Sequence, residues 1–157
     1  MYDKYAENMM LLCYRYIPNK EDAKEVLLDA FYNFFKNIKG FTYQGDGSTR
    51  AWLKKIVMNQ CLMHLRKKKM EFVTDPDGRV TEDISFNNNI IEGLSVKEIV
   101  ALIHGLPDGY RTIFNLYVFD GKGHKEIADL LGISENTSKS QLHKAKALLQ
   151  KKLAVHN

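Results

Sequence analysis

The apolar residues of the chain recur every three or four positions over most of its length, which is the spacing of amphipathic helices. This spacing predicts a helix over residues 1–16, ended by Pro18, and a second helix over residues 21–38. Gly40 stands where glycine favours a helix C-terminus. A loop with two glycines then leads to a third predicted helix over residues 49–68. The first part of the chain is therefore predicted to be a small helical domain.

The helical spacing disappears over residues 70–94, where Asp75-Pro76-Asp77-Gly78 is a turn signal. A segment of this length exceeds the usual connection inside a compact domain, so it is predicted to link two domains. Helical spacing then resumes, and no strand pattern of any length is found. The predicted fold class is all-α, with two small helical domains at residues 1–69 and 95–157, joined by a flexible acidic linker at residues 70–94.

Charge is distributed unevenly along this organisation, although the net charge is only +4. Residues 1–69 hold 13 basic and 7 acidic residues, and residues 95–157 hold 9 basic and 6 acidic residues. Residues 70–94 hold one arginine and 6 acidic residues. Two basic blocks that flank an acidic one suit a polyanionic partner such as nucleic acid.

Several function classes are disfavoured by what the sequence lacks. No apolar run approaches the roughly 18 residues needed to span a bilayer, and the first residues lack the apolar segment of a signal peptide, so a cytoplasmic protein is expected. Cys13 and Cys61 stand in apolar helical patterns and are predicted to be buried thiols. The sequence contains no His-Glu-x-x-His, P-loop or Gly-x-Ser-x-Gly motif and no clustered metal ligands. We therefore expect no enzyme, no cofactor, no metal site and no small-molecule substrate.

The most informative local motif runs from His124 to Leu153 and predicts a helix-turn-helix; its sequence is HKEIADLLGISENTSKSQLHKAKALLQKKL. Gly132 supplies the tight turn, and Ser134 is a good N-cap for the second helix. The second helix also has polar and cationic side chains near its start, and side chains of these types can reach phosphates and base edges in duplex DNA. An ordinary solvated surface would explain the lysines alone, but the turn, the cap and the polar face in register favour DNA binding. The polar, cationic face near the start of this helix consists of Lys139, Ser140, His143 and Lys144.

Two further strings stand in the N-terminal block. They are AKEVLLDAFYNFFKNI, from Ala23 to Ile38, and TRAWLKKIVMNQCLMHLRKKK, from Thr49 to Lys69. Together with LPDGYRTIFNLYVFDGKGHKEIADLLGISENTSKSQLHKAKALL, they resemble the two conserved domains of bacterial sigma-70 family factors. The chain is similar to the small extracytoplasmic-function type, which has only domains two and four.

The resemblance implies that the protein binds core RNA polymerase, at the β′ clamp helices and the β flap, and directs it to promoter DNA. It identifies residues 1–69 with region 2, which binds the core and recognises and melts the −10 element. It identifies residues 95–157 with region 4, which reads the −35 element as duplex. An anti-sigma factor is a further partner that the resemblance implies. In the family the linker threads through the nucleic-acid channels of the polymerase, so the acidic segment is either a mimic of a nucleic-acid strand or a solvated tether.

The same resemblance assigns three sets of residues to functional positions. The core polymerase-binding set is Ala23, Glu25, Val26, Leu28, Asp29 and Phe31. The −10 DNA-binding set is Phe41, Tyr43, Asp46, Trp52, Lys55, Asn59 and Arg66. The −35 DNA-binding set is the face already described on the helix-turn-helix. A loop with aromatics and glycines can wrap an unstacked base, while a basic helix holds the backbone, so the residue types suit these roles. Packing in the core is the alternative role for Trp52, packing under the loop for Phe41 and Tyr43, and a local bond for Asn59.

The chain departs from the family pattern at a few of these positions. Leu28 stands where a Gln is usual, and His64 replaces a common Asp. Ser138 and Gln141 stand where Val and Arg are usual in the DNA-reading helix. These departures bear on the strength of core binding and on the promoter sequence, not on the fold. The alternative function, a helix-turn-helix transcriptional regulator that is not a sigma factor, leaves residues 23–69 unexplained.

Overall fold

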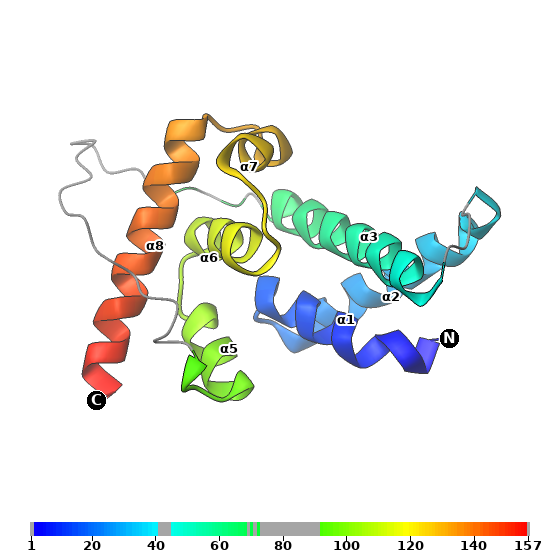
Figure 1. Ribbon diagram of the computed structural model, residues 1–157, viewed down its shortest axis with the longest axis horizontal. Helices are drawn as coiled ribbons and strands as arrows, with labels where there is room; N and C mark the ends of the chain where they lie inside the picture. Colours follow the sequence, from blue (N-terminus) through cyan, green and yellow to red (C-terminus); the bar gives the residue numbers. More distant parts are fainter. Residues whose placement is uncertain (1, 41–44, 69, 71, 73–91, 157) are drawn as a thin grey trace. The chain divides into compact units, whose positions relative to one another are not determined.

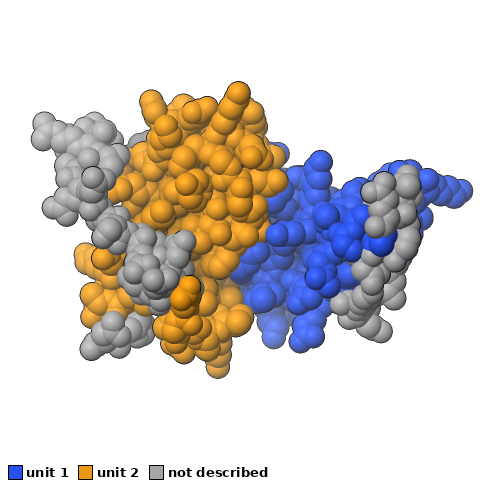
Figure 2. Space-filling model, in the orientation of Figure 1, with its two compact units in different colours: residues 1–69 blue, residues 70–157 orange. Residues whose placement is uncertain are grey.

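The computed structural model of the chain describes residues 2–40, 45–68, 70, 72 and 92–156. Every regular element within these ranges is a helix, so the all-α prediction is confirmed (Figure 1). The chain divides into two compact units, residues 1–69 and residues 70–157, which Figure 2 shows in different colours. Among the described residues, no helix combines the length and the apolar character that crossing a bilayer requires.

Unit 1 is built from three helices, α1 (Tyr2–Tyr16), α2 (Lys20–Lys36) and α3 (Asp46–Lys67), with a short 3-10 turn, η1 (Ile38–Gly40), after α2. Each of the three helices contacts the other two, so their apolar faces meet in one core. The buried apolar residues include Tyr16, Ile17 and Phe34 and both cysteines, which confirms the predicted buried thiols.

The ends of α2 and α3 differ from the predicted ones. Helix α2 starts after Asn19, whose side-chain oxygen accepts a hydrogen bond from the Asp22 amide at 3.0 Å. It ends at Lys36, with Asn37 as its C-cap, before the predicted cap at Gly40. Helix α3 begins three residues before the predicted start, because Gly45 precedes it at φ 103°, a conformation that side chains other than glycine rarely adopt.

Unit 2 contains α5 (Val96–His104), α6 (Asp108–Phe114), α7 (His124–Leu131) and α8 (Glu135–His156). Helix α6 continues directly into a π-helical turn, η2 (Asn115–Phe119). Ser95 caps α5 reciprocally: its hydroxyl accepts a bond from the Glu98 amide and donates one to the Glu98 carboxylate. The long helix α8 packs against α5, α6 and α7, so it contacts every other α-helix of the unit.

A buried arginine holds the junction between α5 and α6. Arg111 donates from Nη1 to the Leu106 carbonyl at 3.0 Å and forms an ion pair with Asp108. Its own carbonyl accepts a bond from the Asn115 side chain at 3.0 Å, which connects α6 to η2. The chain just after unit 1 is attached to the same helix, since Thr112 Oγ1 lies 3.2 Å from the sulfur of Met70. These buried contacts fix the frame on which α7 and α8 are presented.

Candidate nucleic-acid and partner interfaces

The predicted helix-turn-helix is formed by α7, the turn at Gly132 and α8. Gly132 adopts the left-handed conformation, with φ 67° and ψ 36°, and its amide donates to the Ala128 carbonyl. The Ile133 amide donates to the same carbonyl at 3.1 Å, which closes the end of α7. The hydroxyl of Ser134 then accepts a bond from the Thr137 amide at 3.0 Å and starts α8. The glycine turn and the serine cap are therefore where the sequence predicted them.

The four residues of the predicted −35 set lie on α8, and none of them belongs to the buried core. Lys139 is exposed, and Ser140, His143 and Lys144 are half-buried. Asn136, which the sequence analysis overlooked, is also exposed, four residues before Ser140. Helical spacing alone could have found it, because positions four and seven apart share a face. Asn can bond both edge atoms of adenine, so it belongs to the same candidate surface.

Two polar residues of α8 lie inside the unit instead. Ser138 has no exposed surface and Gln141 is only 2% exposed. They share this inward face with apolar residues such as Leu142 and Ala145. The two departures from the family pattern therefore concern the packing of α8 and do not extend its outer face.

Ser138 is bonded to the first residue of α7. The Nδ1 atom of His124 lies 2.8 Å from the Ser138 hydroxyl, and the His124 ring stacks on Tyr117 with centroids 4.7 Å apart. The Lys146 ammonium lies 5.6 Å from the centroid of the same tyrosine. Burial lowers the pKa of His124, and the positive charges of Lys139 and Lys146 lower it further, against a smaller opposing effect of Glu135. The His124 ring is therefore neutral near pH 7.

The outer face of α3 carries three residues of the predicted −10 set. Lys55, Asn59 and Arg66 are exposed, and their spacing of four and seven residues places them along one side of the helix. Met63, which is 45% exposed, lies on the same side and was not predicted. This side of α3 thus combines cationic, amide and apolar groups in one row.

The remaining −10 residues have different positions. Trp52 is half-buried and packs its ring against Phe34, with centroids 4.9 Å apart. This contact supports its role in the core. Asp46 is the first residue of α3, while Phe41 and Tyr43 lie outside the described residues.

The predicted core polymerase-binding set divides into an inner and an outer half. Ala23, Val26 and Phe31 are buried in unit 1, where α2 packs against α1 and α3, so in the free chain they have almost no surface with which to contact a partner. Glu25, Leu28 and Asp29 are exposed. The buried three hold the helix in place, and the exposed three remain candidates for contact.

Two large apolar residues that the sequence analysis did not assign to this surface stand beside Leu28. Leu28, Tyr32 and Phe35 are 59%, 67% and 46% exposed and follow one another at intervals of four and three residues. They form an apolar stripe on the outside of α2, which we call the α2 stripe. Large apolar side chains grouped on one exposed face are typical of protein interfaces.

His64, the third departure from the family pattern, lies near the N-terminal end of α2. Its Nε2 atom is 3.8 Å from a carboxylate oxygen of Asp22, and the Lys68 ammonium is 3.4 Å from the same oxygen. These contacts connect the first turn of α2 to the last turn of α3. The departure therefore belongs to the packing of α2 against α3.

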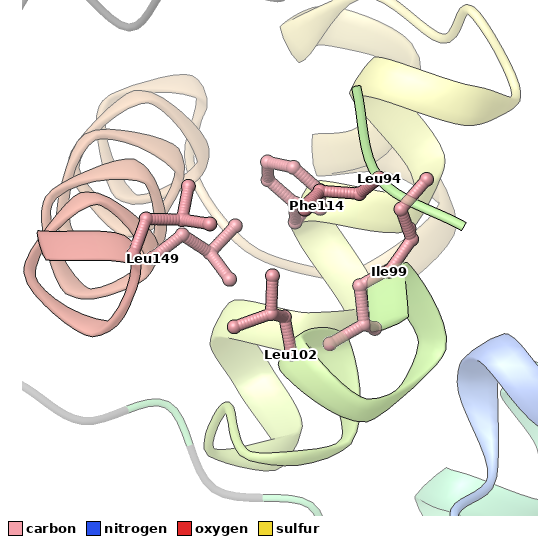
Figure 3. A pocket seen from close by; sticks show the side chains of 7 residues that line it. Leu94, Ile99, Leu102, Phe114 and Leu149 are labelled. Carbon is pink, nitrogen blue, oxygen red and sulfur yellow. The ribbon is translucent and has the colours of Figure 1, made fainter. Parts of the chain in front are cut away.

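Unit 2 has an apolar pocket where α5, α6 and α8 meet (Figure 3). Leu102 from α5, Phe114 from α6 and Leu149 from α8 point toward one another across it. The remaining lining residues are also apolar: Leu94, Ile99, Ile103 and Leu153. The free space in this pocket is only about 10 Å³, and its apolar lining offers no partner to a charged group.

Comparison with known proteins identifies the family to which both units correspond. The model of Sigma-70 region 2 matches residues 1–71, and the model of Sigma-70, region 4, matches residues 96–149. The chain is 29% identical to the ECF RNA polymerase sigma factor SigW of Bacillus subtilis over 96% of its length and 86% of the relative. It is 26% identical to the RNA polymerase sigma-H factor of Pseudomonas aeruginosa over 96% and 82%.

A solved structure has the same fold. It is the sigma factor RpoE in complex with the anti-sigma factor NepR from Bartonella quintana, with a TM-score of 0.55 and 21% identity over the whole of both chains. The two family matches account for both units in the order expected of a sigma factor, which a regulator with a helix-turn-helix alone would not do. The chain therefore belongs to the sigma-70 family and is a sigma factor of the extracytoplasmic-function (ECF) type.

Proposed function

We propose that this sigma factor binds core RNA polymerase through exposed apolar surfaces on both units and reads promoter DNA with the outer faces of α3 and α8. The row of polar and cationic residues on α8, directly after the tight turn at Gly132, is the observation that carries the proposal. A helix presented in this way fits the major groove of B-DNA.

Duplex reading at the −35 element is assigned to the first half of α8. Lys139 and Lys144 supply charge for phosphates or guanine edges. Ser140 and His143 between them, and Asn136 before them, supply hydrogen-bonding groups. Because lysine contacts with phosphates release counterions, the affinity for duplex should fall steeply with salt concentration. Ser138 and Gln141 are buried, so they do not belong to this DNA-reading surface.

Recognition and melting of the −10 element are assigned to the outer face of α3. Lys55 and Arg66 can hold the backbone of an opened strand, and Asn59 can bond a base edge. Met63 adds an apolar surface on which an unstacked base can rest. Asp46, the first residue of α3, remains part of this proposed site, as do Phe41 and Tyr43, which precede it in the sequence.

Core binding is assigned first to the α2 stripe. The stripe presents Leu28, Tyr32 and Phe35 to solvent, and Glu25 and Asp29 lie at its margin. An apolar centre with charged residues around it is the usual composition of a protein interface. We assign this surface to the β′ clamp helices of the polymerase.

The apolar pocket of unit 2 is assigned to the β flap. Its lining is entirely apolar and comes from the elements around α5, α6 and α8, but its free space is only about 10 Å³, so a partner side chain could enter only if these helices move apart. An anti-sigma factor is the second proposed partner, since the similar RpoE is bound to one. Such a factor would inhibit by covering the α2 stripe or the pocket.

The decisive experiment reconstitutes a holoenzyme from the full chain and core polymerase, selects bound promoter DNA from a random library and sequences it. Recovery of two spaced elements, and transcription from a promoter that carries them, is expected. A chain that neither binds core nor changes the DNA that core transcribes would refute the proposal. A chain that binds duplex DNA but not core would instead support the regulator alternative.

A further inference from the structure

The ring of His124 connects three elements of the helix-turn-helix domain. His124 is the first residue of α7, its Nδ1 atom lies 2.8 Å from the Ser138 hydroxyl on α8, and its ring stacks on Tyr117 of η2. The two stacked rings are inclined by only 21°. A rigid aromatic group held at two points fixes the distance between the elements that hold it.

The contact to Ser138 lies where it can control the DNA-reading surface. Ser138 has no exposed surface, so its hydroxyl needs a partner inside the protein, and the His124 ring provides one. Ser138 is adjacent in sequence to Lys139 and is in the first turns of α8, which carry the proposed −35 face. A change in how Ser138 is held therefore moves Lys139 and Ser140 relative to α7.

We propose that His124 is a positioning residue for promoter recognition, which sets the first turns of α8 against α7 through Ser138. This inference rests on the proposed reading of duplex DNA by α8. His124 does not itself need to contact a base. Its role is to keep the row from Lys139 to Lys144 at the angle that fits the groove.

The charges around the ring give this role a pH dependence. Lys139, Lys146 and Glu135 of α8 face His124, Tyr117 of η2 stacks on it, and Lys125 and Glu126 follow it on α7. In the free protein the two α8 lysines oppose protonation of His124. Duplex phosphates beside Lys139 would offset that repulsion and favour the protonated ring. Binding of DNA therefore takes up a proton at His124, and affinity rises as the pH is lowered.

The test uses three variants of the full chain in the reconstituted holoenzyme. His124→Phe keeps a ring to stack on Tyr117 and removes the bond to Ser138, and Ser138→Ala removes the hydroxyl. His124→Asn keeps a polar atom close to the place of Nδ1 but does not titrate. Their affinities are measured for a promoter duplex recovered by the selection described above and for an unrelated duplex of equal length.

We expect His124→Phe and Ser138→Ala each to weaken binding of the promoter duplex by roughly fivefold, the effect of one lost hydrogen bond. Binding of the unrelated duplex should change less. The double variant should bind the promoter duplex no more weakly than either single variant, because both changes remove the same bond. His124→Asn should keep most of the affinity of the unchanged chain. Multiplied losses in the double variant, or equal losses on both duplexes, would overturn the proposal.

A pH titration gives a readout that a purely structural role would not change. Because His143 is a second histidine on the reading face, the titration is done in a His143→Gln background at constant ionic strength. Promoter affinity should rise between pH 8 and pH 6 with His124 present and stay flat with His124→Asn. Parallel curves would overturn the proton-linked role. A holoenzyme that selects no promoter at all would refute the proposed function itself, so the two failures are distinguishable.

Discussion

Truncation of Leu28 to Ala tests the assignment of the α2 stripe as the core-binding surface. Full burial of a leucine side chain contributes about 1.5–3 kcal/mol. Leu28 is 59% exposed in the free chain, so a partner that covers it gains part of this free energy. We expect Leu28→Ala to weaken core binding by about 1 kcal/mol, which corresponds to roughly fivefold in Kd.

The effect should appear in binding and not in folding. Leu28 is mostly in solvent and Ala is at least as favourable in a helix, so the free energy of unfolding should change by less than about 0.5 kcal/mol. The assay is a titration of labelled chain with core polymerase, followed by fluorescence anisotropy. Leu11→Ala on α1 is the matched control, since Leu11 is also an exposed leucine of unit 1 but lies outside the stripe.

The reasoning fails if the control and the test behave alike. Unchanged core affinity in Leu28→Ala, and in Leu28→Ala combined with Tyr32→Ala, would show that the stripe does not contact core. An equal loss in Leu11→Ala would show that general apolar character, and not this surface, controls binding. Loss of core binding with unchanged affinity for promoter duplex would confirm that the two surfaces act separately.

Three further changes test other parts of the chain. Lys144→Glu should weaken binding of a −35 duplex by about 1–3 kcal/mol in an electrophoretic mobility assay, and unchanged affinity would count against the chosen face. Gly132→Ala should lower the free energy of unfolding, measured in urea, by about 1 kcal/mol. The cost is conformational alone, because φ is 67° and an added Cβ would meet open space. The control is Gly123→Ala, which should be nearly neutral because φ there is −77°. Since the pKa of His124 is lowered in the folded chain, the unfolded chain binds its proton more readily. His124 thus stabilises the fold above its ordinary pKa of 6.5, and this contribution is lost as the pH falls below that value; urea titrations of His124→Asn should lack this part of the pH dependence.

Much of the fold follows from local rules that the sequence states directly. The helical period placed the three helices of unit 1, and Gly132 and Ser134 placed the turn and the cap of the helix-turn-helix. The start of α3 was missed because it is set by the backbone conformation of Gly45, with no side-chain cap to mark it. Element type was therefore readable from side-chain pattern, while boundaries set by the backbone alone were not.

The site residues were harder to predict from the sequence, because the pattern of a wide apolar stripe does not show which part of the stripe faces the core. On α2, Ala23 and Phe31 were grouped with Leu28 as contact residues, yet α1 and α3 bury the first two and leave the third in solvent. Ser138 and Gln141 show the converse on α8, where two polar side chains are buried inside unit 2. Only the tertiary contacts decide these cases.

These exceptions to the inward-apolar, outward-polar rule are informative about function. The exposed parts of Leu28, Tyr32 and Phe35 lie together on one helix and favour association with other apolar surfaces. A buried serine hydroxyl is likewise costly without a partner, and the fold places the His124 ring beside it. The exposed apolar side chains of the α2 stripe are thus expected to be covered by a partner. The buried Ser138 hydroxyl has its partner within the chain, in a contact that is proposed to orient α8. For that reason the α2 stripe is expected to determine whether the polymerase is bound, and the His124–Ser138 contact how well the promoter is read.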